Sequence, residues 1–194
     1  MRACAADRAA LAKMCDPRIR ADSTLLDVCY AVCTTLERDG VTAVLTGGSA
    51  ATFYAPEAYQ SRDADFIVMK RPRIISSPSA METLGYNERS GIYIHETNAF
   101  TVEFPPGPLA IGGDLVSAWE TFERHDEQLH VLNRTDCVRD RLAGFYFYAD
   151  RSSLRSAVAV ARSGAIDIDC IRTWSERERE LARFEDFLEE LRRD

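Results

Sequence analysis

The sequence predicts an α+β fold, in which a sheet flanked by helices fills most of the chain and a helical part ends it. Short β-branched runs alternate with turn signals through the first two thirds, and a strongly periodic helix precedes them. Beyond about residue 134 the apolar spacing becomes helical. We therefore expect a core over 20–133 and a helical C-terminal region packed on it over 134–194.

The first predicted elements are a helix, a strand and a second helix. Apolar residues recur at helical spacing from residue 23 or 24 to 38, and Gly40 can end that helix. A β-branched run over 41–46 predicts a strand that stops at Gly47-Gly48. A glycine turn and a short helix over 49–55, halted by the following proline, come next.

The middle of the chain predicts further strands. A buried strand is expected over 65–69, and two more over 92–95 and 100–104. A helix is expected within 78–84, and the Pro- and Gly-rich stretch 105–113 predicts a loop. A hairpin from 119–122 and 129–132 completes this part.

The helical end of the chain has recognisable capping signals. We expect Thr135 or Asp136 to cap a helix running to about residue 148, and Ser152 or Ser153 to cap the next, which ends near residue 164. A capping box is predicted before the last helix, which presents an apolar side to a neighbour. Its residues are Ser175 and Glu178, and the apolar side consists of Leu181, Phe184, Leu188 and Leu191.

Composition limits the kinds of partner. The chain has 194 residues, 46% of them hydrophobic and 28% charged, with a formal net charge of −7. Binding of nucleic acid through charge alone needs clustered Lys and Arg, which this balance argues against. No stretch reaches transmembrane length and no apolar signal-peptide core is present, so we expect a cytoplasmic protein with no membrane association.

The cysteines show no paired spacing of the zinc-ribbon type. Two of them lie one turn apart on the first predicted helix. We therefore expect reduced, buried thiols. The six are Cys4, Cys15, Cys29, Cys33, Cys137 and Cys170.

Carboxylates converge on one face of the predicted sheet. Asp63 and Asp65 alternate along a strand, so both side chains and that of Ser61 point the same way. Glu103 lies inside an apolar run, where an unpaired carboxylate is costly to bury. Neighbouring carboxylates repel unless a cation lies between them, and oxygen ligands suit Mg²⁺ or Mn²⁺. The alternative for the Asp pair is a strand edge facing water.

The glycine turn upstream strengthens the metal hypothesis. Gly47 and Gly48 let backbone amides approach a phosphate, the following helix N-terminus favours negative charge, and Ser49 can add its hydroxyl. Taken alone, a Gly-Gly pair is usually only a turn. A phosphate-binding turn beside carboxylates that hold two cations about 3.5 to 4 Å apart is typical of in-line phosphoryl or nucleotidyl transfer.

Two segments carry a family resemblance. Leu45-Thr-Gly-Gly-Ser-Ala and Ser61-Arg-Asp-Ala-Asp-Phe-Ile resemble the signature of the DNA polymerase β-like nucleotidyltransferase superfamily. Within it the chain is similar to small bacterial nucleotidyltransferases related to the AbiEii-type toxins of toxin-antitoxin and abortive-infection systems. The resemblance runs from roughly Val41 to Ala161.

The resemblance implies a nucleotidyltransferase-type mixed, twisted sheet over 20–133. It implies a catalytic metal, Mg²⁺ or Mn²⁺, at Asp63 and Asp65, and places Ser49 near the phosphates; many superfamily members carry a carboxylate at the position of Glu103. Relatives often have a lysine near Arg139, so this arginine is a candidate to grip the triphosphate. The alternative is a solvated helix face with local ion pairs.

The function implied is metal-dependent transfer of a nucleoside monophosphate from an NTP to a hydroxyl. The acceptor is a tRNA or other RNA, a protein or a small molecule, and the chain is a candidate toxin with a cognate antitoxin as partner. Lys70, Arg71 and Arg73 form a basic run that could receive a tRNA end, the alternative being surface solvation. A non-catalytic nucleotide-binding or partner-binding module with the same fold is the alternative function.

Overall fold

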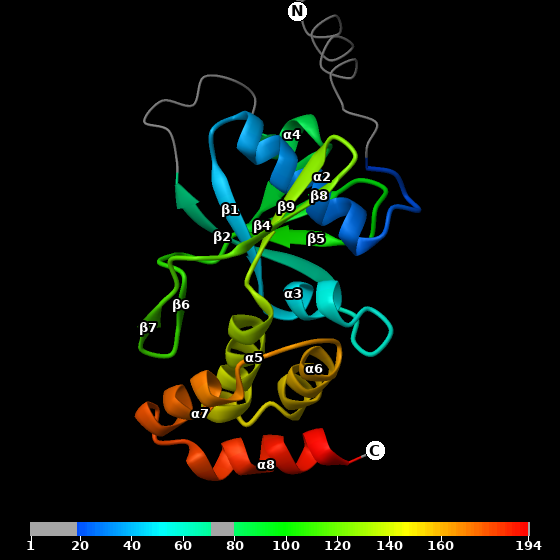
Figure 1. The fold of residues 1–194 in the computed structure, drawn as a ribbon. Helices are drawn as coiled ribbons and strands as arrows, with labels where there is room; N and C mark the ends of the chain where they lie inside the picture. The colour runs from blue at the N-terminus through cyan, green and yellow to red at the C-terminus, as the bar shows by residue number, and fades with distance from the viewer. Residues whose placement is uncertain (1–18, 71–79, 194) are drawn as a thin grey trace, which may run out of the picture.

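The computed structural model describes residues 19–70 and 80–193. Within them seven strands form one mixed sheet in the order β3-β4-β5-β2-β1-β9-β8, and a separate hairpin pairs β6 with β7 (Figure 1). The strands are β1 (Thr42–Thr46), β2 (Asp63–Lys70), β3 (Tyr86–Arg89), β4 (Ile92–His95), β5 (Thr101–Glu103), β6 (Ala110–Ile111), β7 (Asp114–Leu115), β8 (Glu120–Arg124) and β9 (Glu127–Val131). The helices are α2 (Leu25–Arg38), α3 (Gly47–Tyr54), α4 (Ala80–Thr83), α5 (Arg134–Tyr148), α6 (Arg151–Arg162), α7 (Ile168–Arg177) and α8 (Leu181–Arg192).

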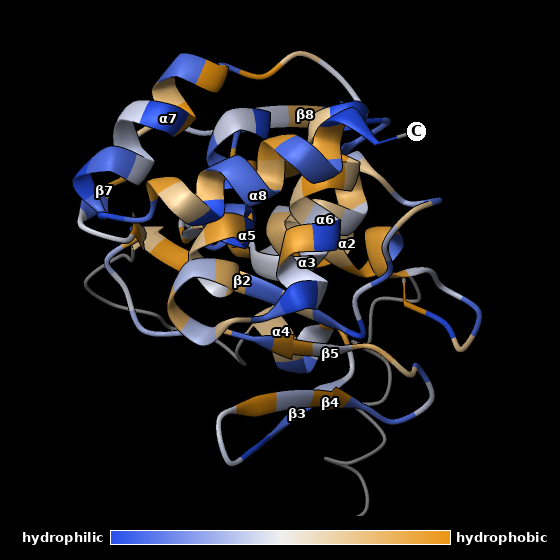
Figure 2. Ribbon diagram, turned by 90° about the horizontal axis from the view of Figure 1, so that it is seen from below, coloured by the Kyte–Doolittle hydropathy of each residue, from blue (hydrophilic) through white to orange (hydrophobic). Residues whose placement is uncertain are grey.

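The α+β class is therefore confirmed, with a mixed sheet and a helical C-terminal part. β1 runs antiparallel to β2 and parallel to β9, while β2 runs parallel to β5. Helix α2 packs on β1 and β9, and α3 contacts β1 and β2. Figure 1 shows α5 to α8 beyond α3, away from α2 and α4. Viewed from below, α8 lies across α5 and α6 (Figure 2).

The first helix forms as predicted because its start is capped twice. The Thr24 hydroxyl accepts a hydrogen bond from the amide of Asp27 at 3.2 Å, and the Asp27 carboxylate accepts one from the Thr24 amide at 2.9 Å. Such a capping box satisfies two donors that the helix itself leaves free. The helix then buries its apolar side against the sheet.

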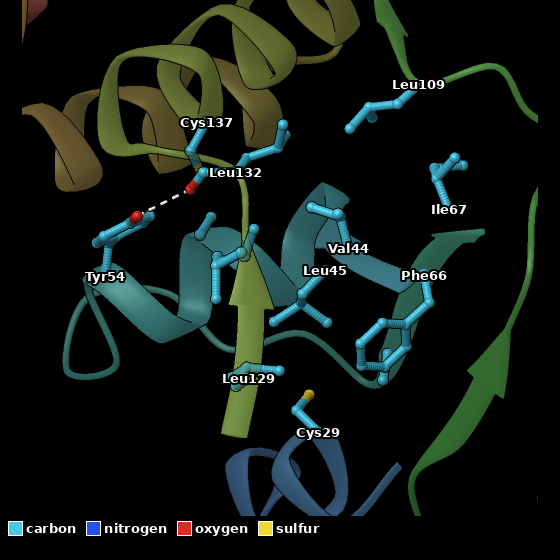
Figure 3. Packing of buried hydrophobic residues seen from close by; sticks show 14 of the residues in the cluster. Cys29, Val44, Leu45, Tyr54, Phe66, Ile67, Leu109, Leu129, Leu132 and Cys137 are labelled. Carbon is cyan, nitrogen blue, oxygen red and sulfur yellow. Dashed lines mark hydrogen bonds between the residues drawn. The ribbon is translucent and has the colours of Figure 1, made fainter. Parts of the chain in front are cut away.

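The core lies between α2 and the sheet, with a second part under α5. Leu45, Phe66 and Leu129 approach Cys29 of α2 (Figure 3). On the other side the Tyr54 hydroxyl donates a hydrogen bond to the Leu132 carbonyl at 2.8 Å, which joins α3 to the end of β9. Both sides of the central strands are thus covered.

The cysteine expectation is partly wrong. Cys29, Cys33 and Cys137 are buried free thiols, as predicted, and burial raises the pKa of Cys33 to about 12. Cys170 is free but exposed, because it lies on the outer side of α7. Cys4 and Cys15 lie outside the described residues. Among the residues that the structure describes, no helix is long and apolar enough to cross a membrane.

Two of the predicted helix starts are wrong by a few residues. Asn133 caps α5 by accepting from the Asp136 amide at 2.9 Å. Asp150 caps α6 by accepting from the amides of Ser152 and Ser153. In each case a residue two positions before the first predicted cap has a side chain that accepts from the free N–H groups.

The predicted capping box at Ser175 and Glu178 is wrong. Ser175 lies inside α7, fully buried, and its hydroxyl donates to the Ile171 carbonyl at 2.8 Å and lies 2.9 Å from the Tyr146 hydroxyl. Helix α8 begins only at Leu181, which is exposed, while Phe184 and Leu188 are buried as expected. Neither α7 nor β3 was predicted from the sequence.

Candidate functional site

Strand register brings the predicted carboxylates together. On the parallel pair β2 and β5, Asp65 lies opposite Glu103 and Asp63 lies opposite Thr101. Side chains of paired residues stand on the same face of a sheet, and residues two apart on a strand do as well. The intervening residues Ala64 and Val102 are fully buried on the other face. Asp63, Asp65 and Glu103 therefore share one face at the centre of the sheet.

Gly47 packs so closely against the carboxylate of Asp65 that no side chain fits between them. Helix α3 begins at Gly47, two residues earlier than predicted, and the predicted glycine turn is confined to Gly47. Gly47 has φ of 65°, and a Cβ added there would lie 2.5 Å from the nearest Asp65 carboxylate oxygen. Only glycine combines that backbone angle with this approach. The N-terminus of α3 and a carboxylate of β2 are thus in direct proximity.

Gly48 makes room for a second polar cluster. A Cβ on Gly48 would lie 2.9 Å from the Ser61 hydroxyl oxygen and 3.0 Å from that of Tyr59. The Ser61 hydroxyl donates to an Asp63 carboxylate oxygen at 2.7 Å. The two glycines therefore face the two aspartates of β2, Gly47 directly and Gly48 through Ser61.

Ser49 holds the site together instead of facing it. Its fully buried hydroxyl donates to the Thr46 carbonyl at 2.8 Å and accepts from the Asp65 amide at 3.1 Å. Both hydrogen-bonding roles of the hydroxyl are occupied by backbone. The contact with phosphates predicted for Ser49 is therefore not available, and the residue fixes Asp65 relative to α3.

Like charges accumulate at Asp65. Burial, first of all, and then the neighbouring carboxylates of Asp63 and Glu103 raise the pKa of Asp65 to about 6, against the opposing effect of Arg141. A carboxylate with a raised pKa gains most from a cation or a proton that reaches it. Groups of this kind gather at functional sites.

A cavity of about 330 Å³ opens in front of Asp65, at the lower end of the range typical of ligand sites. One side consists of Thr46, Gly47 and Asp65, and Asp140 and Arg141 of α5 face them. The remaining wall is a proline-rich segment together with Ile67. The segment contributes Pro105, Pro106, Pro108, Leu109 and Ala110.

The hairpin that continues this wall is tied to α7, and we call these ties the hairpin anchor. The Glu178 carboxylate accepts from the Gly113 amide at 2.8 Å, and the Trp174 indole N–H donates to the Ile111 carbonyl at 3.3 Å. Asp114 completes the hairpin anchor through an ion pair of 2.5 Å with Arg177. The predicted loop 105–113 therefore ends in an ordered two-stranded hairpin.

Arg139, predicted to bind the nucleotide, is placed elsewhere. Its side chain is 8% exposed and pairs with Asp114 at 2.5 Å and Asp136 at 2.7 Å. The guanidinium carbon lies 5.2 Å from the ring centre of Trp174. The alternative of local ion pairs holds for Arg139, although the side chain is buried and not solvated.

Arg141 occupies the position that we expected of Arg139. It lines the cavity with Asp65, and its guanidinium donates to Asp140 at 2.7 and 3.0 Å. Residues two apart on a helix point to opposite sides, so only one of the two arginines can face the sheet. Of the two arginines in the run Arg139-Asp140-Arg141, the structure places Arg141 at the cavity and Arg139 in ion pairs away from it.

The carboxylates fit a metal only in part. Across residues 19–70 and 80–193, no three His, Cys, Asp or Glu side chains form a group that could hold a metal ion by themselves. Mg²⁺ is often bound by one or two carboxylates together with substrate phosphates and water. Asp65, desolvated among other carboxylates, suits that mode, so the residues fit a metal–nucleotide complex better than a bare ion.

The basic run lies at the edge of what is described. Lys70 ends β2 and is exposed, whereas Arg71 and Arg73 lie outside the described residues.

Comparison with protein-family models, with curated proteins and with solved structures gave no match to this chain. The family resemblance of the two motifs therefore stays a prediction.

Proposed function

We propose that the chain is a metal-dependent nucleotidyltransferase that transfers a nucleoside monophosphate from an NTP to a hydroxyl acceptor. The observation that carries the proposal is the contact of Gly47 with Asp65, which joins the start of a helix to a carboxylate cluster. A helix N-terminus favours phosphate, and clustered carboxylates favour a divalent cation. A Mg²⁺- or Mn²⁺-bound triphosphate satisfies both at once.

Each residue has a defined part in this proposal. Asp65, with Asp63 and Glu103 beside it, would hold the cation, which supplies charge neutralisation at the transferred and leaving phosphates when bound. Arg141 faces Asp65 across the cavity and supplies a second positive charge to the phosphates. The first amides of α3 have no partner inside the helix and are free to donate. The acceptor oxygen forms a bond to the α-phosphorus as the bond to pyrophosphate breaks.

The proposal defines only the chemical class of the acceptor. It carries a hydroxyl, and RNA such as tRNA, a protein or a small molecule each qualify. A role as the toxin of a toxin-antitoxin pair belongs to the same proposal, since transfer onto an essential RNA would stop growth. Expression with and without Asp65→Asn separates growth arrest by catalysis from arrest by binding.

The proposal is tested with labelled NTPs, Mg²⁺ and total RNA or cell lysate. We expect label transfer with at least one nucleotide, and a loss of about a hundredfold or more in Asp63→Asn/Asp65→Asn. Asp169→Asn/Asp186→Asn is the matched control, because it removes the same charge at two exposed positions. Transfer that persists in the site variant would show that other residues carry the activity.

Binding is measured separately by calorimetric titration with NTP in the presence of Mg²⁺ or of a chelator. If Asp65→Asn loses both the metal-dependent binding of NTP and the transfer activity, the result supports the enzyme hypothesis. Metal-dependent binding without transfer to any acceptor would favour the non-catalytic module instead. Absence of both would contradict a nucleotide site at the carboxylates.

A further inference from the structure

A second hollow lies in the helical part of the molecule. It has a volume of about 660 Å³ and is framed by α6, by the end of α8 and by the loop after α3. Helices α6 and α8 are neighbours in both views (Figures 1 and 2). We call it the α6–α8 hollow. The residues that line it are Ala58, Arg151, Leu154, Arg155, Val158, Ala159, Arg162, Glu190 and Arg193.

Two of the four arginines in the hollow have structural partners. Arg162 donates to the carbonyls of Glu190 and Leu191 at 3.0 and 3.2 Å, so it satisfies the free carbonyls at the end of α8. Arg193 pairs with Glu190 at 2.7 Å. Both guanidinium groups therefore already bind partners within the fold.

The other two arginines are not neutralised. Arg151 and Arg155 are exposed and stand one turn apart on α6. Arg155 forms no ion pair or hydrogen bond with any residue in 19–70 or 80–193, and Arg151 only stacks on Phe145, with the guanidinium carbon 5.4 Å from the ring centre. On a chain with net charge −7, two adjacent unpaired arginines form a local positive site.

The walls of the hollow are aliphatic. Leu154, Val158 and Ala159 continue α6 beside the arginines, and Ala58 faces them from the loop. None of the nine lining residues is aromatic, so the hollow offers no surface on which bases stack, as single-stranded nucleic acids require. Aliphatic walls with a cationic edge match a peptide that has leucine-like and carboxylate side chains.

We propose that the α6–α8 hollow is a docking surface for an acidic amphipathic helix of a partner protein. Carboxylates four residues apart on such a helix are separated by one turn, which is the separation of Arg151 and Arg155 on α6. The aliphatic side of the partner helix then lies on Ala58 and Ala159, above the nearly buried Leu154 and Val158. Guanidinium groups bind carboxylates through paired N–H donors, which fixes the orientation of the helix.

This surface is separate from the carboxylate site. Asp65 lines another cavity, and the two cavities share no residue. The inference therefore does not depend on the proposed transferase activity. A chain with Asp63→Asn and Asp65→Asn is expected to bind the partner helix unchanged.

The test uses a fluorescent synthetic helix of about four turns, with leucines on one side and glutamates four residues apart beside them. Fluorescence anisotropy with the full chain is expected to give saturable binding that weakens with salt. In Arg151→Ala/Arg155→Ala the affinity is expected to fall at least about tenfold. Lys70→Ala/Arg89→Ala, which removes the same charge from two other exposed positions, is expected to leave it unchanged. Circular dichroism checks that all variants fold.

Three results would overturn the proposal. The first is no binding of the peptide, or binding that survives the double substitution on α6. The second is a single-stranded RNA oligomer that binds the same two arginines more tightly than the peptide does. The third is a dimer in sedimentation that Arg151→Ala/Arg155→Ala dissociates, since the occupant would then be a second copy of this chain.

Discussion

Two clusters of charged side chains in this protein differ in how their charges are balanced. Around Asp65, the carboxylates of Asp63 and Glu103 add like charge, and their combined effect with burial raises the pKa of Asp65 to about 6. Around Arg139, the carboxylates of Asp114 and Asp136 lie within 2.7 Å and compensate the guanidinium. The first cluster gathers like charges, whereas the second pairs its carboxylates with a guanidinium, of which only the Nε has no hydrogen-bond partner among the described residues.

The difference supports the proposal that the carboxylate cluster is the one that binds a cation. A compensated buried pair stabilises the fold only as long as both partners remain. A cluster of like charges lowers stability until a cation or proton reaches it. The two clusters therefore respond to mutation with opposite sign, and that contrast can be measured.

The largest effect is expected for Arg139→Ala. Removing the guanidinium leaves Asp136 without its ion-pair partner and Asp114 with only the exposed Arg177, so the free energy of unfolding should fall by about 3 kcal/mol. Urea unfolding followed by circular dichroism measures it. Arg141→Ala is the comparison, and we expect it to lose nucleotide binding with a much smaller loss of stability. Equal losses in the two variants would contradict the distinction between the clusters.

Gly47→Ala should cost about 2 kcal/mol in the free energy of unfolding, because alanine adds a strained φ and a clash with the Asp65 carboxylate. Gly48→Ala is the matched control, since its Cβ would meet the ends of two side chains that can move. Thermal unfolding should place Gly47→Ala clearly below Gly48→Ala. The reverse order would mean that the contact between Gly47 and Asp65 does not constrain the site.

Asp65→Asn should raise stability at pH 7.5 by about 1 to 2 kcal/mol, a range reduced for the partial exposure of this carboxyl group. The folded pKa of Asp65 is raised above the ordinary value of 3.8, so the fold binds the proton more tightly than the unfolded chain does. The stability that this proton contributes is fully present below pH 3.8 and is lost as pH rises through about 6. The advantage of Asp65→Asn over the wild type should therefore vanish at pH 4 or below. A gain that is the same at both pH values would show that repulsion is not its cause.

The smallest effect is expected for Arg177→Ala, below about 0.5 kcal/mol. Arg177 pairs with the same Asp114 oxygen as Arg139, at 2.5 Å, but its side chain is 58% exposed. An exposed ion pair is screened by water and contributes little. Unfolding curves of Arg139→Ala and Arg177→Ala therefore compare a buried and an exposed ion pair with the same carboxylate, that of Asp114.

Much of the fold could be predicted where pattern and capping agree. Helix α2 has an apolar stripe, a capping box and a terminating glycine, so each signal supports the others. Strand β3 could not be predicted, because it has one buried residue and forms by pairing with β4. Helix α7 is short and polar, and its buried Ser175 imitates a cap. Burial that depends on a packing partner is not written in local sequence.

The carboxylate face was predictable because strand periodicity alone decides it. Asp63 and Asp65 share a face in any straight strand, and the structure adds Glu103 through the register with β5. Ser49 and Arg139 were misplaced for a different reason. A serine can bind backbone or ligand equally well, and the direction of one arginine on a helix depends on what its neighbours bury.

The hairpin anchor limits where the chain can be truncated. Pro105 to Ala110 wall the cavity, and the hairpin that follows them is tied to Trp174, Arg177 and Glu178 of the C-terminal part. A fragment ending before α7 would retain Asp63, Asp65 and Glu103 but would lose the ties that hold the wall opposite Asp65. The C-terminal helices therefore help to hold one wall of this cavity in place.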